Sequence, residues 1–211
     1  MAENEKKEEI RTLPNGEEVE YYDDTHTYIV RGREVPSITT LLKIVYGDNY
    51  SAVDPDLLKR SSDYGTAVHQ ELDSLISLRE LGYDIEDLMN YQETKNYFHY
   101  VEPMYKIKPV LTEQIVVLYN KDKEPVAAGR FDLICEVDGV KTLADFKTTT
   151  TIHRQSVSAQ LNLYRRAAYQ SGYIEDENLP VGVIHLSGKV YEYKTLINFG
   201  EGFFKKFNVE R

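Results

Sequence analysis

The chain has 211 residues and a formal net charge of −10, and its sequence pI is about 5.0. This length suits one α/β domain, and the acidic balance argues against broad adhesion to nucleic acid through a basic surface. It does not exclude a metal site that binds phosphate, because such a site is acidic by construction and the metal supplies the positive charge.

Cysteine content limits both the compartment and the cofactors. Cys135 is the only cysteine, so no disulfide framework, iron–sulfur cluster or cysteine-based zinc site can form within one chain. We therefore expect a reducing, cytoplasmic location. No apolar run is long enough to cross a bilayer, so no membrane partner is expected. Residues 1–16 open with a polar stretch without a signal-peptide core, and we expect a disordered or weakly ordered tail there.

Short β-elements are expected first along the chain. Val19–Tyr22 and Thr27–Val30 are rich in β-branched and aromatic residues, and Arg31–Arg33 is typical of the turn that follows them. Ser37 then begins a helix, because a serine hydroxyl accepts hydrogen bonds from the free N–H groups of a first helical turn. Gly47-Asp48-Asn49 ends this helix.

Two helical regions follow. Residues 51–81 are expected to form one or two helices, because their apolar side chains recur at i, i+4, i+7 and i+8 and make an amphipathic stripe. Residues 84–101 are expected to form another helix, which Pro103 breaks. The stripe on the first region consists of Val68, Leu72, Leu75 and Ile76.

Three strands are predicted for the middle of the chain. Residues 112–119 form the first of them, and residues 127–137 and 140–147 form a hairpin. Asp138-Gly139 lies between the two arms of the hairpin. This pair favours a two-residue type I′ turn, which needs a positive φ angle at both central positions.

The register of this hairpin brings two carboxylates together. If Val137 pairs with Val140, Asp132 lies opposite Asp145 and Arg130 faces Lys147. The other face of the hairpin is mostly apolar and is expected to be core. That face carries Phe131, Leu133, Cys135, Val137, Val140, Ala144 and Phe146.

Two opposed carboxylates beside a core need an explanation, because like charges directly across a ladder are destabilising. A bound divalent cation is one explanation, since carboxylate oxygens suit Mg²⁺ or Mn²⁺. Lys147 lies two residues after Asp145 and projects to the same face. The alternative is a solvated surface hairpin whose acidic pair has no function.

The rest of the chain continues the alternation of helices and strands. A helix is expected over residues 158–170, strands over 181–186 and 190–193, and a final helix over 197–207. This order predicts one mixed α/β domain over residues 17–211, with a central mixed β-sheet flanked by helices.

Four residues have the chemical types that metal-assisted phosphodiester hydrolysis requires. Asp132 and Asp145 would hold a metal, which polarises a phosphoryl oxygen and makes hydroxide available near neutral pH. Lys147 would orient the attacking water and stabilise charge on the phosphate. His69 lies beside the apolar stripe of its helix, where it is either a metal ligand or a hydrogen-bonded core residue.

Five motifs between residues 65 and 164 resemble those of the PD-(D/E)XK nuclease superfamily, in particular its RecB-like branch. The resemblance implies a restriction-endonuclease-like core. Each motif alone is weak, but their shared order is hard to obtain by chance. The matches are Gly65…His69 to GxxxH, an acidic position at Glu113, Gly129-Arg130-Phe131-Asp132 to G-R-x-D, Asp145-Phe146-Lys147 to the D/E-x-K element, and Gln160…Tyr164 to QxxxY.

The N-terminal part resembles a smaller group within this branch. His26-Thr27-Tyr28, followed by Val35-Pro36-Ser37-Ile38-Thr39, is similar to the entry segment of phage-encoded members and of the mitochondrial genome maintenance exonuclease. This similarity implies a host cell that is bacterial or infected by a phage.

The resemblance implies a role for each matching residue. His69, Asp132, Asp145 and the backbone carbonyl of Phe146 would bind one or two Mg²⁺ or Mn²⁺ ions, and Lys147 would be the catalytic lysine. Glu113 is either a partner of a ligand or of metal-bound water at the catalytic centre, or a solvated acid at the start of a strand. Contacts to DNA are implied for Gly65, Thr66, Arg130, Gln160, Tyr164, Ser37 and Thr39, although Ser37 is also a plain helix cap.

Other features of this branch are uncertain or missing. Arg154, Arg165 and Arg166 lie on a predicted helix, either facing phosphates or forming a solvated face. The cysteines that hold an iron–sulfur cluster in CRISPR-adaptation and AddB-type relatives are missing, and so is any helicase motif.

The expected activity is metal-dependent hydrolysis of DNA phosphodiester bonds, by an exonuclease that acts on DNA ends or single strands in recombination, repair or replication. One alternative is a structure-specific endonuclease with the same active site. Another is a nuclease-fold binding module that docks on a replication or recombination protein and cleaves little. A last alternative is an unrelated α/β domain with a chance hairpin.

Overall fold

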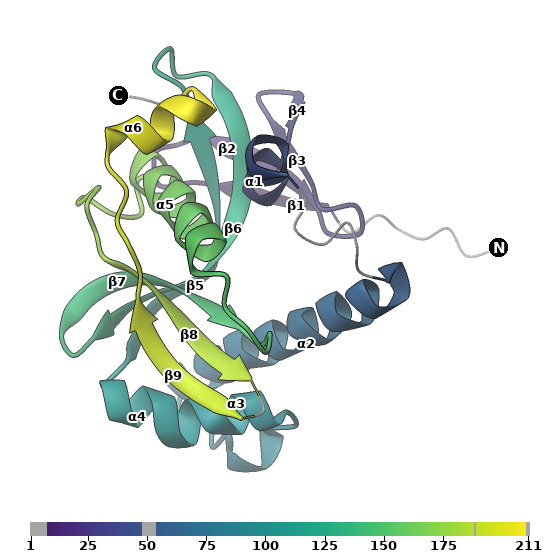
Figure 1. The fold of residues 1–211 in the computed structure, drawn as a ribbon, viewed down its shortest axis with the longest axis vertical. Helices are drawn as coiled ribbons and strands as arrows, with labels where there is room; N and C mark the ends of the chain where they lie inside the picture. Colours follow the sequence, from purple (N-terminus) through teal and green to yellow (C-terminus); the bar gives the residue numbers. More distant parts are fainter. Residues whose placement is uncertain (1–7, 48–53, 188, 210–211) are drawn as a thin grey trace.

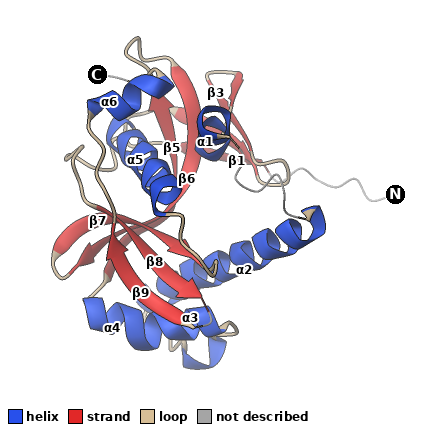
Figure 2. Ribbon diagram, viewed as in Figure 1, coloured by secondary structure: helices blue, strands red, loops and turns tan. Residues whose placement is uncertain are grey.

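The computed structural model describes residues 8–47, 54–187 and 189–209, and it contains two β-sheets and the helices that cover them (Figures 1 and 2). The larger sheet has five strands in the order β5-β6-β7-β8-β9. The predicted mixed α/β class, with a central mixed sheet flanked by helices, is confirmed. The five strands are β5 Lys108–Tyr119, β6 Pro125–Val137, β7 Val140–Lys147, β8 Val181–Ser187 and β9 Val190–Thr195.

Helix α5, Arg154–Gln170, connects β7 to β8, and these two strands run parallel. All other neighbours in the sheet are antiparallel. Two parallel strands need such a crossover connection, because the chain must return to the starting end of the sheet before the second strand begins. The observed α5 begins four residues before the predicted helix and ends where predicted.

The predicted hairpin forms with its predicted turn. Asp138 and Gly139 have φ angles of 48° and 81°, as a type I′ turn requires, and Val137 pairs with Val140. The ladder between β6 and β7 nevertheless ends at the pair Leu133↔Ala144.

Two predicted pairs lie beyond this point, Asp132 with Asp145 and Arg130 with Lys147, and β6 and β7 form no main-chain pairing there. The outer edges of the two strands stay paired, Asp145 with Val183 of β8 and Arg130 with Ile115 of β5. The predicted register is therefore confirmed up to Leu133↔Ala144, and the predicted continuation of the pairing beyond it is wrong. Val140, predicted for the core face, is 54% exposed at the hairpin end.

The smaller sheet begins earlier in the chain than predicted. Its order is β1-β2-β3-β4, and β1 lies within the stretch expected to be a disordered tail. That expectation is wrong for residues 8–12, because β1 pairs antiparallel with β2 along its whole length, while residues 1–7 lie outside the described residues. The four strands are β1 Glu8–Thr12, β2 Glu18–Tyr22, β3 Thr27–Val30 and β4 Arg33–Val35.

Helix α1, Ile38–Tyr46, has the predicted cap, with the Ser37 hydroxyl accepting a hydrogen bond from the Thr40 N–H at 3.0 Å. Gly47 ends it with a φ of 80°, and the rest of the predicted stop, 48–49, lies outside the described residues. Helix α2, Pro55–Glu80, is one continuous helix, and it buries the predicted apolar stripe.

The predicted helix over residues 84–101 is confirmed for residues 92–101 and wrong for its first part and its end. The chain instead forms a series of short helical segments, and Pro103 does not break the last of them. Pro103 lies in the first turn of α4, which directly follows the π-helical segment before it. The segments are η1 Glu86–Leu88, α3 Gln92–Asn96, the π-helical η2 Tyr97–Val101 and α4 Glu102–Tyr105.

The final predicted helix, 197–207, is also shorter. Only α6 Glu201–Phe204 and η3 Lys205–Phe207 are helical. Buried Asn162 of α5 holds the preceding segment in a non-helical path, because its amide donates to the Ile197 carbonyl at 2.8 Å and accepts from the Phe199 N–H at 2.7 Å. These bonds occupy backbone groups that a helix would otherwise pair.

Three apolar clusters hold the sheets and helices together. One face of the large sheet packs against α5, and the lower half of its other face packs against α2 and the segments after it, where Cys135 is fully buried. The upper half of that other face packs against the small sheet, through Ile115 and Val117. The hairpin β5–β6 contributes side chains to all three clusters.

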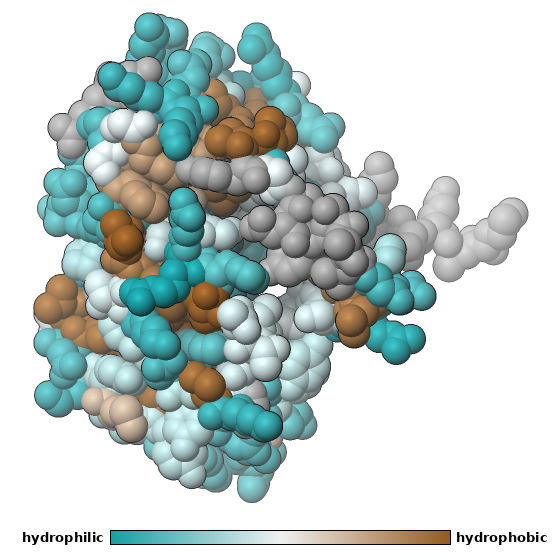
Figure 3. Space-filling model, in the orientation of Figure 1, coloured by the Kyte–Doolittle hydropathy of each residue, from teal (hydrophilic) through white to brown (hydrophobic). Residues whose placement is uncertain are grey.

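The face of the molecule in Figure 3 is mainly hydrophilic, with apolar side chains in separate patches. Single exposed apolar residues are normal on such surfaces. Among the described residues, none of the helices is long and apolar enough to cross a membrane.

The packing of α2 on the large sheet gives a test of the fold. Leu72 is fully buried in the cluster beneath the sheet, so Leu72→Ala should lower the free energy of unfolding by about 2–5 kcal/mol. Leu57 lies on the same helix but is 62% exposed, so Leu57→Ala should change it by about 0.5 kcal/mol or less. Urea unfolding followed by circular dichroism measures both, and equal losses would contradict this packing.

Candidate metal centre

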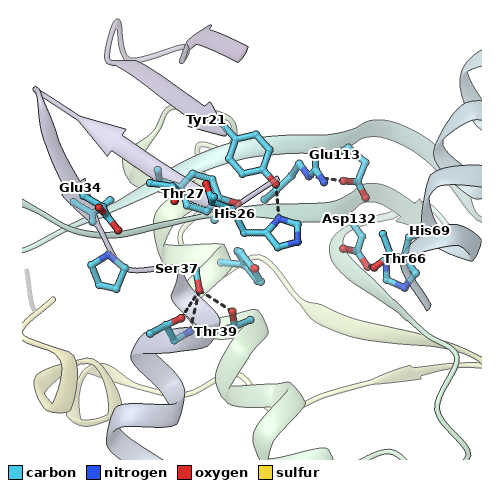
Figure 4. Close-up of a pocket in the computed structure, with 18 of the residues that line it drawn as sticks. Tyr21, His26, Thr27, Glu34, Ser37, Thr39, Thr66, His69, Glu113 and Asp132 are labelled. Atoms are coloured by element: carbon cyan, nitrogen blue, oxygen red, sulfur yellow. Dashed lines mark hydrogen bonds and ion pairs between the residues drawn. The ribbon is translucent and has the colours of Figure 1, made fainter. Parts of the chain in front are cut away.

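A cavity of about 890 Å³ lies where the small sheet, α1, α2 and the β5–β6 hairpin meet. Figure 4 shows side chains from each of these elements facing it, with His69, Glu113 and Asp132 on one side and Ser37 and Thr39 on another. Tyr164 reaches it from α5. The cavity therefore gathers most of the residues that the motifs singled out, from segments far apart in the sequence.

Glu113 and Asp132 lie directly across from each other on β5 and β6. The pairs on either side, Thr112↔Leu133 and Gln114↔Phe131, fix this placement. Glu113 has a φ of 49°, a left-handed backbone conformation that costs a non-glycine residue about 1 kcal/mol or more. The pair of opposed carboxylates predicted for this sheet thus exists, but Glu113 rather than Asp145 is the partner of Asp132.

Both strands turn over at this position. Phe131 and Ile134 belong to the same cluster beneath α5, although residues three apart on a regular strand point to opposite faces. On β5, Val116 and Leu111 contact that same cluster, and their spacing of five also requires a change of face between them. Because the strands change face at Glu113 and Asp132, the regular alternation between core and surface is interrupted there. The two carboxylates can therefore face the cavity rather than the core.

Three side chains at this point can share a cation. One ligand atom each from His69, Glu113 and Asp132 lies within 4.8 Å of the others, and no other such trio is found among the described residues. His69 comes from α2, and its Nδ1 is 3.3 Å from Asp132 Oδ2. Two carboxylates and one imidazole form a donor set that suits Mn²⁺ and, through the oxygens, Mg²⁺.

The electrostatics of the trio favour a bound positive charge. Burial, followed by the nearby Asp132 carboxylate, raises the pKa of Glu113 to about 8, although Arg130 acts in the opposite direction. Arg130 Nε lies 2.7 Å from Glu113 Oε2. Because one guanidinium does not offset burial beside a second carboxylate, a divalent cation would stabilise the ionised form of this glutamate.

Asp145 and Lys147 form a buried ion pair beside the trio. Asp145 is 3% exposed, and its Oδ2 is 2.6 Å from Lys147 Nζ. Burial raises the pKa of Asp145 to about 6 against the lowering effect of Lys147, and Asp132 raises it further. Asp145 thus lies outside the group of three, with its charge directed to the lysine.

Asp132 also links the trio to β7. Its Oδ2 accepts a hydrogen bond from the Phe146 N–H at 2.8 Å, so the observed contact of Phe146 is made through its amide rather than through its carbonyl. The Phe146 ring lies edge-on to the His69 ring, with centroids 5.9 Å apart. The position of His69 is thereby fixed from both sides, by Asp132 and by this ring.

Tyr164 and Gly129 form a matched pair on the cavity wall. A Cβ atom at position 129 would lie 2.7 Å from Tyr164 Cε1, so only glycine leaves room for the ring. Gln160, one turn earlier on α5, hydrogen-bonds to Tyr164. The two motifs that contain these residues therefore meet in space, and their contact explains why each needs its residue type.

The remaining expected contacts vary in their access to the cavity. Thr66 lines it, but Gly65 does not. Gly65 instead lies against Thr148, whose Oγ1 would be 3.4 Å from a Cβ atom at position 65. Ser37 and Thr39 line it as well, with their hydroxyls 2.9 Å apart. His26 reaches it from the β2–β3 turn, where its Nδ1 is 2.8 Å from the Tyr21 hydroxyl.

Arg165 and Arg166 belong to the core. The predictions that they face phosphates or form a solvated helix face are therefore both wrong. Arg165 is 2% exposed and donates to the Leu179 carbonyl, while Arg166 is 5% exposed and pairs with Glu201. Arg154, at the start of α5, is exposed.

Tyr21 and Gln70 also line the cavity, although no motif contains them. Tyr21 lies at an inward-facing position in the alternating pattern of β2, so the local sequence does not distinguish it from an ordinary core tyrosine. Its proximity to Arg130 follows from how the small sheet packs on the large one, which the sequence pattern of neither sheet records.

Comparisons with known proteins add little to this geometry. No protein-family model matches the chain, and no curated protein matches it. A search of solved structures finds a likeness to a protein described as the crystal structure of SSO0001, with 12% sequence identity, a TM-score of 0.35 and 81% of each chain covered. A likeness this distant carries no argument about the chain.

Proposed function

We propose that the chain is a divalent-metal-dependent deoxyribonuclease with a restriction-endonuclease-like core. The supporting observation is the convergence of His69, Glu113 and Asp132 on one cavity, next to the ion pair of Asp145 and Lys147. This combination supplies the acids, the imidazole and the lysine that phosphodiester hydrolysis requires.

The described residues fit a divalent cation. His69, Glu113 and Asp132 would hold it, and Asp145 lies next to this group through its interactions with both His69 and Asp132. When bound, Mg²⁺ or Mn²⁺ supplies Lewis acidity toward a phosphoryl oxygen and lowers the pKa of water. The half-buried, opposed carboxylates of Glu113 and Asp132 support this assignment, because a site built only for stability would gain by avoiding them.

The protein groups have separate tasks in this proposal. Lys147 is held by Asp145, so its ammonium group is oriented and can donate hydrogen bonds to an attacking water or a phosphate oxygen. Asp132 is fixed by the Phe146 N–H, which keeps its carboxylate aimed at His69. Tyr164 lines the cavity from α5, with Gln160 hydrogen-bonded to it, and Tyr164 would contact the DNA backbone.

The shape of the cavity supports single strands or DNA ends as substrates. The small sheet, α1, α2, α5 and the β5–β6 hairpin all contribute to its lining, which includes the hydroxyl groups of Ser37, Thr39, Thr40 and Thr66. These hydroxyl groups suit hydrogen bonding to a flexible phosphodiester chain. We therefore propose exonuclease action in recombination, repair or replication.

End-labelled DNA provides the test of this function. Linear single-stranded, linear double-stranded and covalently closed circular DNA would each be incubated with Mg²⁺, Mn²⁺ or EDTA. Loss of linear DNA only, and only with metal, is expected. Nicking of circles would replace the exonuclease by a structure-specific endonuclease, and absence of cleavage in all conditions would contradict the proposal in favour of a binding module.

Substitutions at the site should remove cleavage without unfolding the protein. Asp132→Asn and Lys147→Met should each lower the rate by at least about 100-fold, because each removes a charged group from the reacting centre. Lys121→Met changes the same charge in the β5–β6 loop, outside the cavity, and should leave the rate unchanged. Cleavage by Lys147→Met at the native rate would exclude the assigned role of this lysine.

Glu113→Gln distinguishes two possible sets of metal ligands. One is the trio of His69, Glu113 and Asp132, and the other, implied by the family resemblance, has Asp145 in place of Glu113. If Glu113 holds the ion, this substitution should weaken Mn²⁺ binding at least about tenfold, as removing one charged ligand does. Titration of Mn²⁺ by electron paramagnetic resonance measures this directly, without DNA. Unchanged Mn²⁺ affinity would remove Glu113 from the proposed ligands and leave His69, Asp132 and Asp145.

The raised carboxyl pKa values predict how stability depends on pH. A Glu113 pKa of about 8 in the folded protein, above the unfolded value of 4.5, means that the folded state binds its proton more tightly. This contribution is complete below about pH 4.5 and is lost as the pH rises through about 8. The melting temperature in EDTA should therefore fall between about pH 5 and pH 8.

Divalent cations should reverse this loss at the upper end of the range, since they compete with the proton for the same carboxylate. Glu113→Gln should flatten the pH profile in EDTA, because the amide does not titrate. Thermal unfolding across the same pH series tests both statements. A wild-type melting temperature in EDTA that rises steadily between about pH 6 and pH 8 would contradict the raised pKa.

A further inference from the structure

We infer that Arg130 is a preset phosphate fork, which binds one backbone phosphate of the substrate through its two Nη atoms. This inference rests on the proposed function, in which Arg130 is one of several expected DNA contacts, and adds to it the atoms and the geometry by which this residue recognises the polyanion. It concerns substrate binding alone and can be tested without cleavage.

Two contacts fix the direction of the Arg130 side chain. Its Nε is 2.7 Å from Glu113 Oε2, and its guanidinium carbon lies 5.4 Å from the centre of the Tyr21 ring. The first contact engages one edge of the guanidinium plane, and the second engages a face. An arginine held in both ways has lost most of its rotational freedom before any ligand arrives.

The remaining edge of the guanidinium has no hydrogen-bond partner in the part of the chain that the structure describes. Among residues 8–47, 54–187 and 189–209, nothing hydrogen-bonds to Arg130 Nη1 or Nη2, and the side chain lines the 890 Å³ cavity and is 31% exposed. Nη1 and Nη2 each carry N–H donors in a planar fork whose geometry matches two oxygens of a phosphate. Its open edge is therefore suited to bidentate binding of a phosphodiester.

A second arginine shows what a purely structural arrangement looks like in this protein. Arg31 also stacks on a tyrosine, Tyr119, and also pairs with a glutamate, Glu17. Its Nη2 donates to Glu17, however, and its Nη1 donates to the Lys123 carbonyl at 2.9 Å, so both ends of its fork are used. Arg130 has the same two supports and keeps its fork open.

The surrounding charges decide on which side of Arg130 a phosphate would bind. A second cavity of about 480 Å³ borders the same side chain, and Glu9, Asp23 and Asp73 are among its lining residues. Carboxylates there repel a phosphate. The large cavity also has carboxylates, but Glu113 and Asp132 belong to the trio, whose bound cation would offset their charge. It adds hydroxyl groups that can donate to phosphate oxygens, so we place the phosphate on that side.

The fixed orientation of Arg130 also explains how an acidic protein could bind a polyanion. The chain carries a net charge of −10, so it cannot hold a nucleic acid by a general positive field. A single arginine, oriented in advance and partly desolvated, supplies a local contact that depends little on the net charge. We therefore expect Arg130 to account for a large share of the substrate affinity.

Fluorescence anisotropy with a labelled single-stranded oligothymidylate tests this, with Ca²⁺ in place of Mg²⁺ so that binding is measured apart from cleavage. The dissociation constant would be measured at several NaCl concentrations for each variant. Arg130→Gln should weaken binding about tenfold, and the slope of log K against log salt should fall in magnitude by about 0.7, the loss of one phosphate contact on a single strand.

Two further variants separate phosphate binding from a structural role. Arg130→Lys keeps the charge but not the fork, so it should retain the slope while weakening binding several-fold. Tyr21→Leu removes the stacking surface and should weaken binding, also without changing the slope. Lys121→Gln, which removes a charge from the distal β5–β6 loop, should match the wild-type protein.

The outcomes distinguish this inference from the proposed function. If Arg130→Gln and Arg130→Lys both bind the oligonucleotide with wild-type affinity and slope, Arg130 is not a phosphate ligand, whether or not the protein cleaves DNA. If the wild-type protein binds no oligonucleotide and cleaves none with Mg²⁺ or Mn²⁺, both proposals fall. Metal-dependent cleavage together with an unchanged slope in Arg130→Gln overturns only this inference.

Discussion

The Asp132 carboxylate is the point on which the rest of the site depends. Its hydrogen bond to the Phe146 N–H joins β6 to β7 where the main-chain ladder between them has ended. The same oxygen faces His69 Nδ1, and Glu113 lies across the adjoining strand. One side chain thus substitutes for a missing backbone contact and brings a helix and two strands to a common point.

This arrangement is held against an electrostatic cost. Glu113, Asp132 and Asp145 lie close enough to influence one another, and two of them are buried enough for their pKa values to rise. Lys147 and Arg130 each neutralise one acid, which leaves the cluster short of positive charge. The apolar clusters on both faces of the hairpin provide the stability that lets such a cluster persist, as is common where function and stability conflict.

Local patterns predicted the elements of this protein well and their irregularities poorly. The hairpin turn, α2 with its apolar stripe and the Ser37 cap follow from periodicity and turn chemistry, and all three are present. The left-handed backbone at Glu113 has no such signal, because it depends on the partner strand and the packing on both sides. Arg165 and Arg166 look like surface residues by type, yet carbonyl and carboxylate partners from distant segments allow their burial.

The single thiol of the chain has a practical consequence for spectroscopy. Cys135 is fully buried beneath the large sheet, and burial raises its pKa to about 12, so almost none of it is thiolate at neutral pH. Maleimide reagents should therefore spare it, and a cysteine introduced on the exposed first turns of α2 would be labelled selectively in the folded protein. Dyes or spin labels placed there and on the small sheet could report the distance across the cavity between these two elements without a cysteine-free background.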